Sequence, residues 1–114
     1  MSNSKKSIYI LFISELNLSK IGISENVGRR VKQLQTGCPF KIDVVRKYDT
    51  ANFYKIEKVL HRKYRTNKMD DNEYNLVGEW FNIPIGEVLN FEENCKEIED
   101  TIIFLRNHNN PFIN

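Results

Sequence analysis

The chain has 114 residues, of which 40% are hydrophobic, and its formal net charge is +2. This length fits a single domain with one modest core, so multidomain architectures are excluded. Leu, Ile, Val and Phe together contribute 35 residues, enough apolar surface to exclude disorder for most of the chain.

The apolar runs and the cysteines indicate the cellular compartment of the protein. The longest apolar run, 8–13, is six residues, far below the ~20 residues of a membrane helix. The N-terminus lacks the apolar stretch of a secretory signal. Cys38 and Cys95 have neither the paired spacing of a zinc site nor the density of a disulfide scaffold. We therefore expect a reduced, intracellular protein with no membrane partner.

Charge is divided unevenly along the chain. Residues 1–68 carry 15 Lys and Arg against five Asp and Glu, whereas residues 69–114 carry two against ten. A basic body with an acidic end is typical of proteins that bind polyanions, because clustered cations release counterions from nucleic acid. Two faces that neutralise each other within the fold would explain the same numbers.

The N-terminal residues predict a β-hairpin. Residues 7–14 are β-branched and aromatic and indicate a buried strand, and residues 19–24 alternate between polar and apolar types. A four-residue loop between them would place Lys20 opposite Ile13, on the same face as Tyr9. The hairpin thus predicts that an amine and a phenol share one face of the sheet.

A helix follows the hairpin. Asn26 can cap its start, and Gly37 stands just beyond its end. At 100° per residue, Arg30 borders the core face and Arg29 points to solvent. The apolar face consists of Val27, Val31 and Leu34.

A third strand and a second helix come next. Residues 42–48 suit a strand, after which Asp49 or Thr50 can cap a helix that runs to about Arg65. Its buried stripe contains Phe53, Ile56, Leu60 and Tyr64. Its opposite face carries Lys55, Lys58, Arg62 and Arg65, a pattern that most often marks a solvated surface.

Two ionisable residues lie at the edge of that apolar stripe. The angle from Phe53 is about 40° for Glu57 and about 80° for His61. A carboxylate there is costly unless it is paired, hydrated in a cleft or bound to a cation, so Glu57 is the first candidate for a functional residue. An ion pair with Arg30 or Lys20 is the competing structural interpretation.

The C-terminal part predicts a different type of element. Residues 79–83 indicate a strand or an extended packing segment, and Pro84 can occupy the first position of a helix. Steps of three and four residues then give an apolar seam made of Val88, Phe91, Cys95, Ile98, Ile102 and Leu105. This helix either covers the core of the domain or pairs with a second copy in a homodimer.

Five segments together carry a resemblance to a known family. They are Ser7-Ile8-Tyr9, Lys20-Ile21-Gly22, the helix with Arg30, the Glu57-x-x-x-His61 pair and Gly78-Glu79-Trp80-Phe81. In this order and spacing the chain resembles the GIY-YIG nuclease superfamily, specifically the branch found in phage, viral and fungal proteins. The resemblance covers residues 7–83, which we assign to a nuclease-like domain, and leaves 84–108 as a C-terminal amphipathic helix. For a viral protein, the intracellular location would be the host cell.

The resemblance implies an α+β fold, a three-stranded antiparallel sheet flanked by helices, and a metal-dependent endonuclease that acts on DNA. Glu57 would hold one Mg2+ or Mn2+ ion, and Tyr9 would deprotonate or orient the attacking water. Arg30 would neutralise charge on the phosphate, and His61 would position water or assist Tyr9. Lys20 would contact a phosphate, at a position where the wider superfamily has a tyrosine.

A phenol both donates and accepts hydrogen bonds, whereas an ammonium group only donates them. Lys20 therefore keeps a second hypothesis open. In that hypothesis the chain is a non-catalytic DNA-binding or assembly module, and the same residues form a structural polar network.

Overall fold

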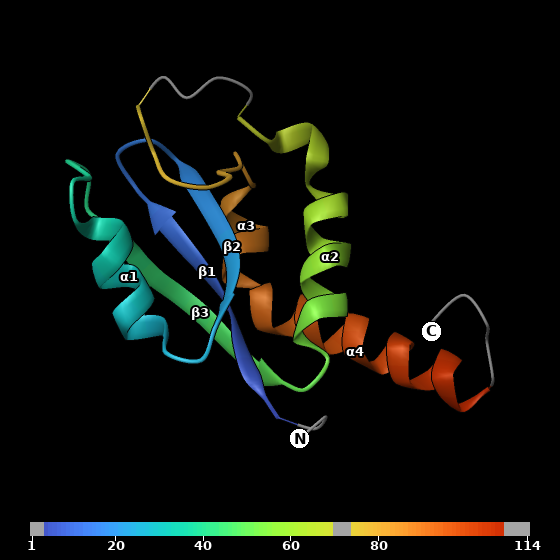
Figure 1. Ribbon diagram of the computed structural model, residues 1–114. Coiled ribbons are helices and arrows are strands. Elements are labelled where there is room, and N and C mark those ends of the chain that lie inside the picture. The colour runs from blue at the N-terminus through green and yellow to red at the C-terminus, as the bar shows by residue number, and fades with distance from the viewer. Residues whose placement is uncertain (1–3, 70–73, 109–114) are drawn as a thin grey trace.

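The computed structural model describes residues 4–69 and 74–108. A three-stranded antiparallel sheet with the order β2-β1-β3 forms its centre, and helices cover both faces (Figure 1). This architecture confirms the predicted α+β class. No helix in the described ranges is long and apolar enough to cross a membrane.

The hairpin forms with a different register from the predicted one. β1 spans Lys6–Ile13 and β2 spans Leu18–Ser24, and Lys20 pairs with Leu11 instead of Ile13. The predicted pairing was therefore wrong by two residues, because the loop between the strands begins one residue earlier. Since side chains alternate with a period of two, Lys20 still lies on the Tyr9 face.

The first helix agrees closely with its prediction. α1 spans Val27–Gln35, and the backbone N–H of Arg29 donates to the Asn26 side chain at 3.0 Å, which is the expected cap. Gly37 follows with a φ of 78°, a conformation that glycine adopts without strain. Arg30 is half-buried and Arg29 is exposed, as the helical angles predicted.

The second helix is shorter than predicted. β3 spans Asp43–Thr50 and pairs with β1, and α2 spans Phe53–Lys63. A 3-10 helix, η1, then covers Arg65–Asn67. Thr50 accepts a hydrogen bond from the Asn52 backbone at 2.9 Å, so the threonine orders the turn before the helix.

Residues 79–83 are extended, as one of the two predictions for them stated. Phe81 exchanges two backbone hydrogen bonds with Ser19, at 2.7 and 2.8 Å, and so continues the sheet at the outer edge of β2. On its other side, Met69 donates to the Trp80 carbonyl at 2.9 Å. Glu79 is thereby fixed beside the β2 edge.

The C-terminal region contains two helices where the sequence predicted one. α3 spans Ile85–Leu89 and α4 spans Phe91–Asn107, and the chain bends at Asn90. Pro84 lies just before α3. Asn90 ends α3, with its backbone N–H donating to the Gly86 carbonyl at 3.1 Å, and stands at the N-cap position of α4.

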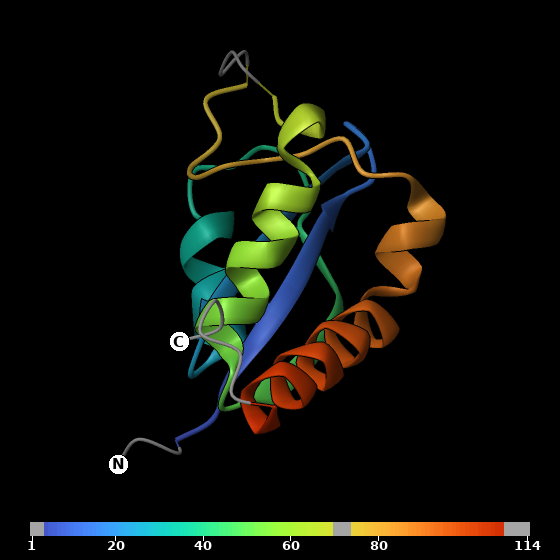
Figure 2. The same ribbon diagram turned by 90° about the vertical axis from the view of Figure 1, so that its right-hand side faces the viewer.

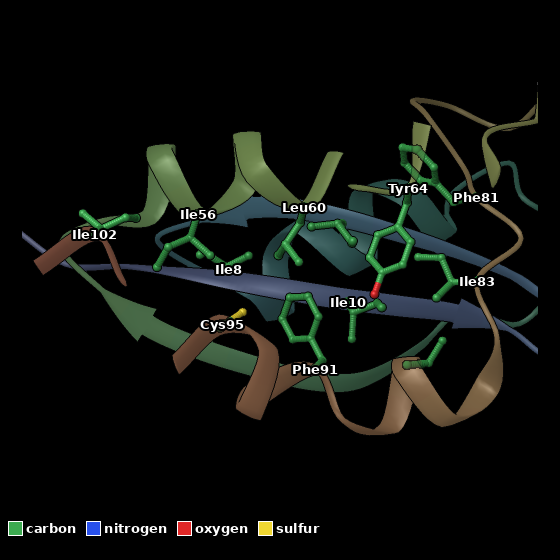
Figure 3. Close-up of a cluster of buried hydrophobic side chains, with 12 residues drawn as sticks. Ile8, Ile10, Ile56, Leu60, Tyr64, Phe81, Ile83, Phe91, Cys95 and Ile102 are labelled. Carbon is green, nitrogen blue, oxygen red and sulfur yellow. The ribbon is translucent and has the colours of Figure 1, made fainter. Parts of the chain in front are cut away.

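Two core clusters lie on opposite faces of the sheet. On one face α1 covers Tyr9 and Leu11, and on the other α2, α3 and α4 cover Ile8 and Ile10 (Figure 2). Figure 3 shows the second cluster, in which side chains of α2 and α4 converge on β1. The buried part of the C-terminal seam belongs to it: Val88, Phe91, Cys95 and Ile102. A homodimer through these side chains would therefore require α4 to leave the sheet.

Candidate active site

The five residues singled out from the sequence come from four elements. Tyr9 lies in β1, Lys20 in β2 and Arg30 in α1, while Glu57 and His61 lie one turn apart in α2. α2 runs beside β2, at the edge of the sheet (Figure 1). The Coulombic influence of Glu57 and Arg30 reaches both Tyr9 and Lys20. These four elements thus bring one set of interacting polar groups to the β2 edge.

Tyr9 is only 2% exposed and pairs with Gly22 across the hairpin. Burial raises the pKa of the Tyr9 phenol above its ordinary value, although the Arg30 guanidinium acts in the opposite direction. The phenol is therefore protonated at neutral pH and offers one donor and an acceptor oxygen.

Lys20 is 8% exposed, which is unusual for a lysine. Burial, together with the nearby Arg30 guanidinium, lowers its pKa, and the carboxylates of Glu57 and Glu79 only partly compensate. Gly78 borders the amine so closely that a Cβ at that position would overlap Nζ. The structure thus holds a poorly solvated amine at the β2 edge.

The Glu57 side chain is 27% exposed and reaches the same edge from α2. Burial raises its pKa, while the charges of His61 and Lys20 act to lower it. Its ion-pair contact is with His61 Nε2, at 3.9 Å. Among the described residues, no ion pair within 4.0 Å joins Glu57 to Arg30 or Lys20. The ion pair with Arg30 or Lys20, which was the competing interpretation of Glu57, is therefore not formed among the described residues.

His61 connects three parts of the site. Its Nε2 lies 2.9 Å from the Ile21 carbonyl oxygen, which can only accept, so this nitrogen carries a proton. Its Nδ1 lies 3.6 Å from Glu79, and its ring packs edge-on against Phe81 at 5.3 Å. The imidazole therefore fixes α2 against β2. Of its two ring nitrogens, Nε2 bonds to the backbone and Nδ1 faces Glu79.

Glu79 is a site residue that the sequence reasoning did not select. Its carboxylate lies 2.6 Å from Lys68 Nζ and 3.6 Å from His61 Nδ1. The Lys68 hydrogen bond lowers the pKa of Glu79 and outweighs the opposing effect of burial. The only signal was its place in the Gly78-Glu79-Trp80-Phe81 segment, because its neighbours lie far away in the sequence.

The donor set fits one kind of metal site. No group of three or more His, Cys, Asp or Glu that could hold a metal ion occurs in ranges 4–69 and 74–108. Mg2+, however, is commonly bound through one or two carboxylates, with water and substrate phosphate completing its shell. The half-buried Glu57 carboxylate, which accepts no hydrogen bond from a described residue, suits that arrangement.

Comparison with known families gives a match over most of the chain. The model of the T5orf172 domain matches residues 6–102. The chain belongs to the T5orf172 domain family. This family is a phage-associated domain related to nuclease-like folds. Searches of the curated proteins and of the solved structures found no match.

The T5orf172 match includes the four elements that build the site and reaches into α4. Membership therefore indicates a nuclease-like or DNA-binding role for the chain. The family is phage-associated, which agrees with the phage or viral context that the resemblance implies.

Proposed function

We propose that this T5orf172 domain is a metal-dependent DNA endonuclease with a site of the GIY-YIG type. The observation that carries the proposal is the convergence of Tyr9, Lys20, Arg30 and Glu57 at the β2 edge. A phenol, two cations and a carboxylate are groups that phosphodiester hydrolysis uses, and the pKa values of Tyr9, Lys20 and Glu57 are altered at this edge. The relation of the family to nuclease-like folds supports the same conclusion.

Glu57 is the residue that would hold the divalent cation, Mg2+ or Mn2+. When bound, that cation would supply positive charge to the reacting phosphate and to the departing 3′ oxygen. Among the described residues Glu57 is not engaged by Arg30 or Lys20, so its oxygens remain available.

Tyr9 and the two cations act on the phosphodiester itself. The Tyr9 oxygen would orient the attacking water or help to remove its proton. Arg30 and Lys20 balance the negative charge of the non-bridging oxygens. The water oxygen bonds to phosphorus and the P–O3′ bond breaks. One proton of the attacking water passes through solvent to the departing 3′ oxygen, and the other stays on the new 5′ phosphate until solvent takes it up.

His61 is a positioning residue in this proposal. Its Nε2 proton is committed to the Ile21 carbonyl, so the ring holds α2, and with it Glu57, at the edge of β2. A His61→Gln variant keeps a donor and is expected to retain more activity than His61→Ala, which loses it.

The direct test is nicking of supercoiled plasmid by purified protein, with and without Mg2+. We expect Mg2+-dependent nicking that falls at least about 100-fold in Glu57→Gln, because removal of a charged group at the reacting centre has effects of this size. Glu93→Gln, an exposed change on α4, is the matched control and should cut like the wild type. Nicking that persists in EDTA, or an unaltered rate in Glu57→Gln, would overturn the proposal.

The second candidate is a non-catalytic DNA-binding or assembly module. The observation that favours it is the engagement of His61 with Ile21 and Glu79, which serves the fold without any substrate. This alternative predicts DNA binding that needs no metal and survives Glu57→Gln, in a protein that does not nick plasmid.

A further inference from the structure

A basic groove adjoins the candidate active site. Its volume is about 430 Å³, and it is lined by Lys58, His61, Arg62, Arg65, Lys68, Glu79 and Phe81. His61 belongs to both places, because its imidazole lines the groove while Nε2 lies 3.9 Å from Glu57. A strand that occupies the groove would therefore continue directly into the site.

Most cations of this groove have no carboxylate partner. Lys58, Arg62 and Arg65 are exposed, and none of them forms an ion pair with any residue in the described ranges. Lys68 is the exception, with its contact to Glu79 at 2.6 Å. Four cations thus face a single carboxylate, which leaves the groove strongly positive.

We propose that this groove binds the backbone phosphates of the DNA strand beside the bond that is cut. The inference rests on the proposed function, and it assigns α2 and η1 a role in holding substrate. Lys58 and Arg62 lie about one turn apart on α2, roughly 6 Å along its axis, and Arg65 follows in η1. The three cations therefore follow one another along the groove, as the phosphates of one strand do.

The walls of the groove indicate contact with phosphates and not with bases. Phe81 is 1% exposed, so its ring is not available to stack on a base. Apart from the Glu79 carboxylate and the His61 imidazole, the accessible polar groups are ammonium and guanidinium groups, which carry no sequence information when they meet phosphate. Binding in this groove is therefore independent of sequence and sensitive to salt.

The test is fluorescence anisotropy of a labelled 20-base-pair DNA duplex in EDTA, at several salt concentrations. Arg62→Gln with Arg65→Gln removes two cations from the groove, and Arg46→Gln with Lys96→Gln removes two exposed cations outside it. We expect the first pair to lower the slope of log affinity against log salt by about 2, and the affinity at least tenfold. The second pair should leave both quantities at the wild-type value. Melting curves of both variants verify that they fold.

Equal losses in the two double variants would overturn the groove as the binding site, even if the wild type nicks plasmid. A wild type that does not bind the duplex would also overturn it, and tighter binding of an RNA duplex of the same sequence would overturn DNA as the occupant. Groove-dependent binding without nicking would retain the groove and remove the nuclease. The two proposals therefore fail separately.

Discussion

The Tyr9 hydroxyl lies directly against Gly22, so that a Cβ at Gly22 would overlap it. The two residues are partners across the β1–β2 ladder. Glycine is needed at this position for space, since any side chain would compete with the phenol for the same volume. The Ser7-Ile8-Tyr9 and Lys20-Ile21-Gly22 segments therefore pack together as one unit.

Gly22→Ala is expected to displace the Tyr9 ring, with a loss of about 1–3 kcal/mol in unfolding free energy from overpacking. Nicking should fall at least tenfold, because the phenol leaves its position. Gly86→Ala is the matched control, since a Cβ there meets no atom within 4 Å among the described residues outside its own helix and its chain neighbours. Denaturant titration and plasmid nicking measure the two effects. A Gly22→Ala protein with wild-type stability and rate would show that the ring has room to move.

A comparison of Gly78→Ala with Gly37→Ala should separate the effect of backbone strain from the effect of displacing Lys20. Gly78 and Gly37 have φ values of 90° and 78°, so alanine at either position costs about 1 kcal/mol of stability. Only at Gly78 would the new Cβ overlap Lys20 Nζ, whereas no atom lies within 4 Å at Gly37. We expect similar melting curves for the two variants and a loss of nicking in Gly78→Ala alone. Equal nicking rates would remove Lys20 from the site.

Side-chain periodicity predicted the faces of the elements and therefore much of the site. It placed Lys20 with Tyr9, put Arg30 at the border of the core face and pointed Arg29 to solvent, all as the structure has them. The hairpin register escaped prediction, because a shift of two residues leaves every side chain on the same face. The loop has the predicted four residues, but its position, which sets the register, has no such signal in the sequence.

Two other features depend on contacts between residues that are distant in the sequence. Glu79 enters the site because Phe81 pairs with Ser19, and no local pattern encodes that pairing. The break at Asn90 was hidden by the apolar spacing, since steps of three and four residues continue from α3 into α4. The bend depends on the packing of both helices against the sheet, which the local spacing does not encode.

Glu57 should couple cation binding to pH. Its folded pKa is raised, so a proton competes with the cation at higher pH than for an exposed glutamate. Affinity for Mn2+, measured by calorimetry from pH 8 down to 5, should fall as the pH drops toward that raised pKa. Glu57→Gln should not bind the ion at any of these pH values. Binding that is constant across the range, or equal in the variant, would place the cation elsewhere.

The same raised pKa predicts that Glu57 destabilises the fold at neutral pH. A carboxyl group with a higher pKa in the folded than in the unfolded state contributes stability below the unfolded pKa, and this contribution is lost as the pH rises through the folded pKa. Glu57→Gln is therefore expected to increase unfolding free energy at pH 7 by up to about 1 kcal/mol while it abolishes nicking. Denaturant titration at pH 7 and pH 4 measures this, with the gain absent at pH 4. A destabilised variant at pH 7 would indicate a structural role for the carboxylate.

Glu79→Gln should strengthen DNA binding. The Glu79 carboxylate forms an ion pair with Lys68 in the basic groove. Its removal frees one cation and removes the groove's negative charge. The salt slope measured by anisotropy should steepen by about 0.9 for one additional phosphate contact. The side chains of this ion pair are 40% and 50% exposed, so stability should change by less than about 0.5 kcal/mol. Weaker binding in the variant would mean that Glu79 orders the groove for DNA.

Glu99 anchors α4 to β3 and offers a test of the fold apart from the site. Its carboxylate accepts hydrogen bonds from Thr50, from Tyr48 at 2.5 Å and from Asn52 at 2.9 Å. Burial acts to raise the pKa of Glu99, but these three bonds outweigh it and hold the pKa below its ordinary value. The stabilisation is thus present above the unfolded pKa and is lost as the pH falls through the folded pKa.

Glu99→Ala is therefore expected to lower unfolding free energy by about 2 kcal/mol at pH 7, the scale of hydrogen bonds to a charged group. The loss should shrink at pH 3, where the wild-type carboxyl group takes up its proton. Glu97→Ala, an exposed change two residues away, is the matched control and should remain within about 0.5 kcal/mol of the wild type. Denaturant titration of the three proteins at both pH values measures these differences. A loss in Glu99→Ala that does not depend on pH would mean that the side chain packs α4 onto β3 without contributing charge.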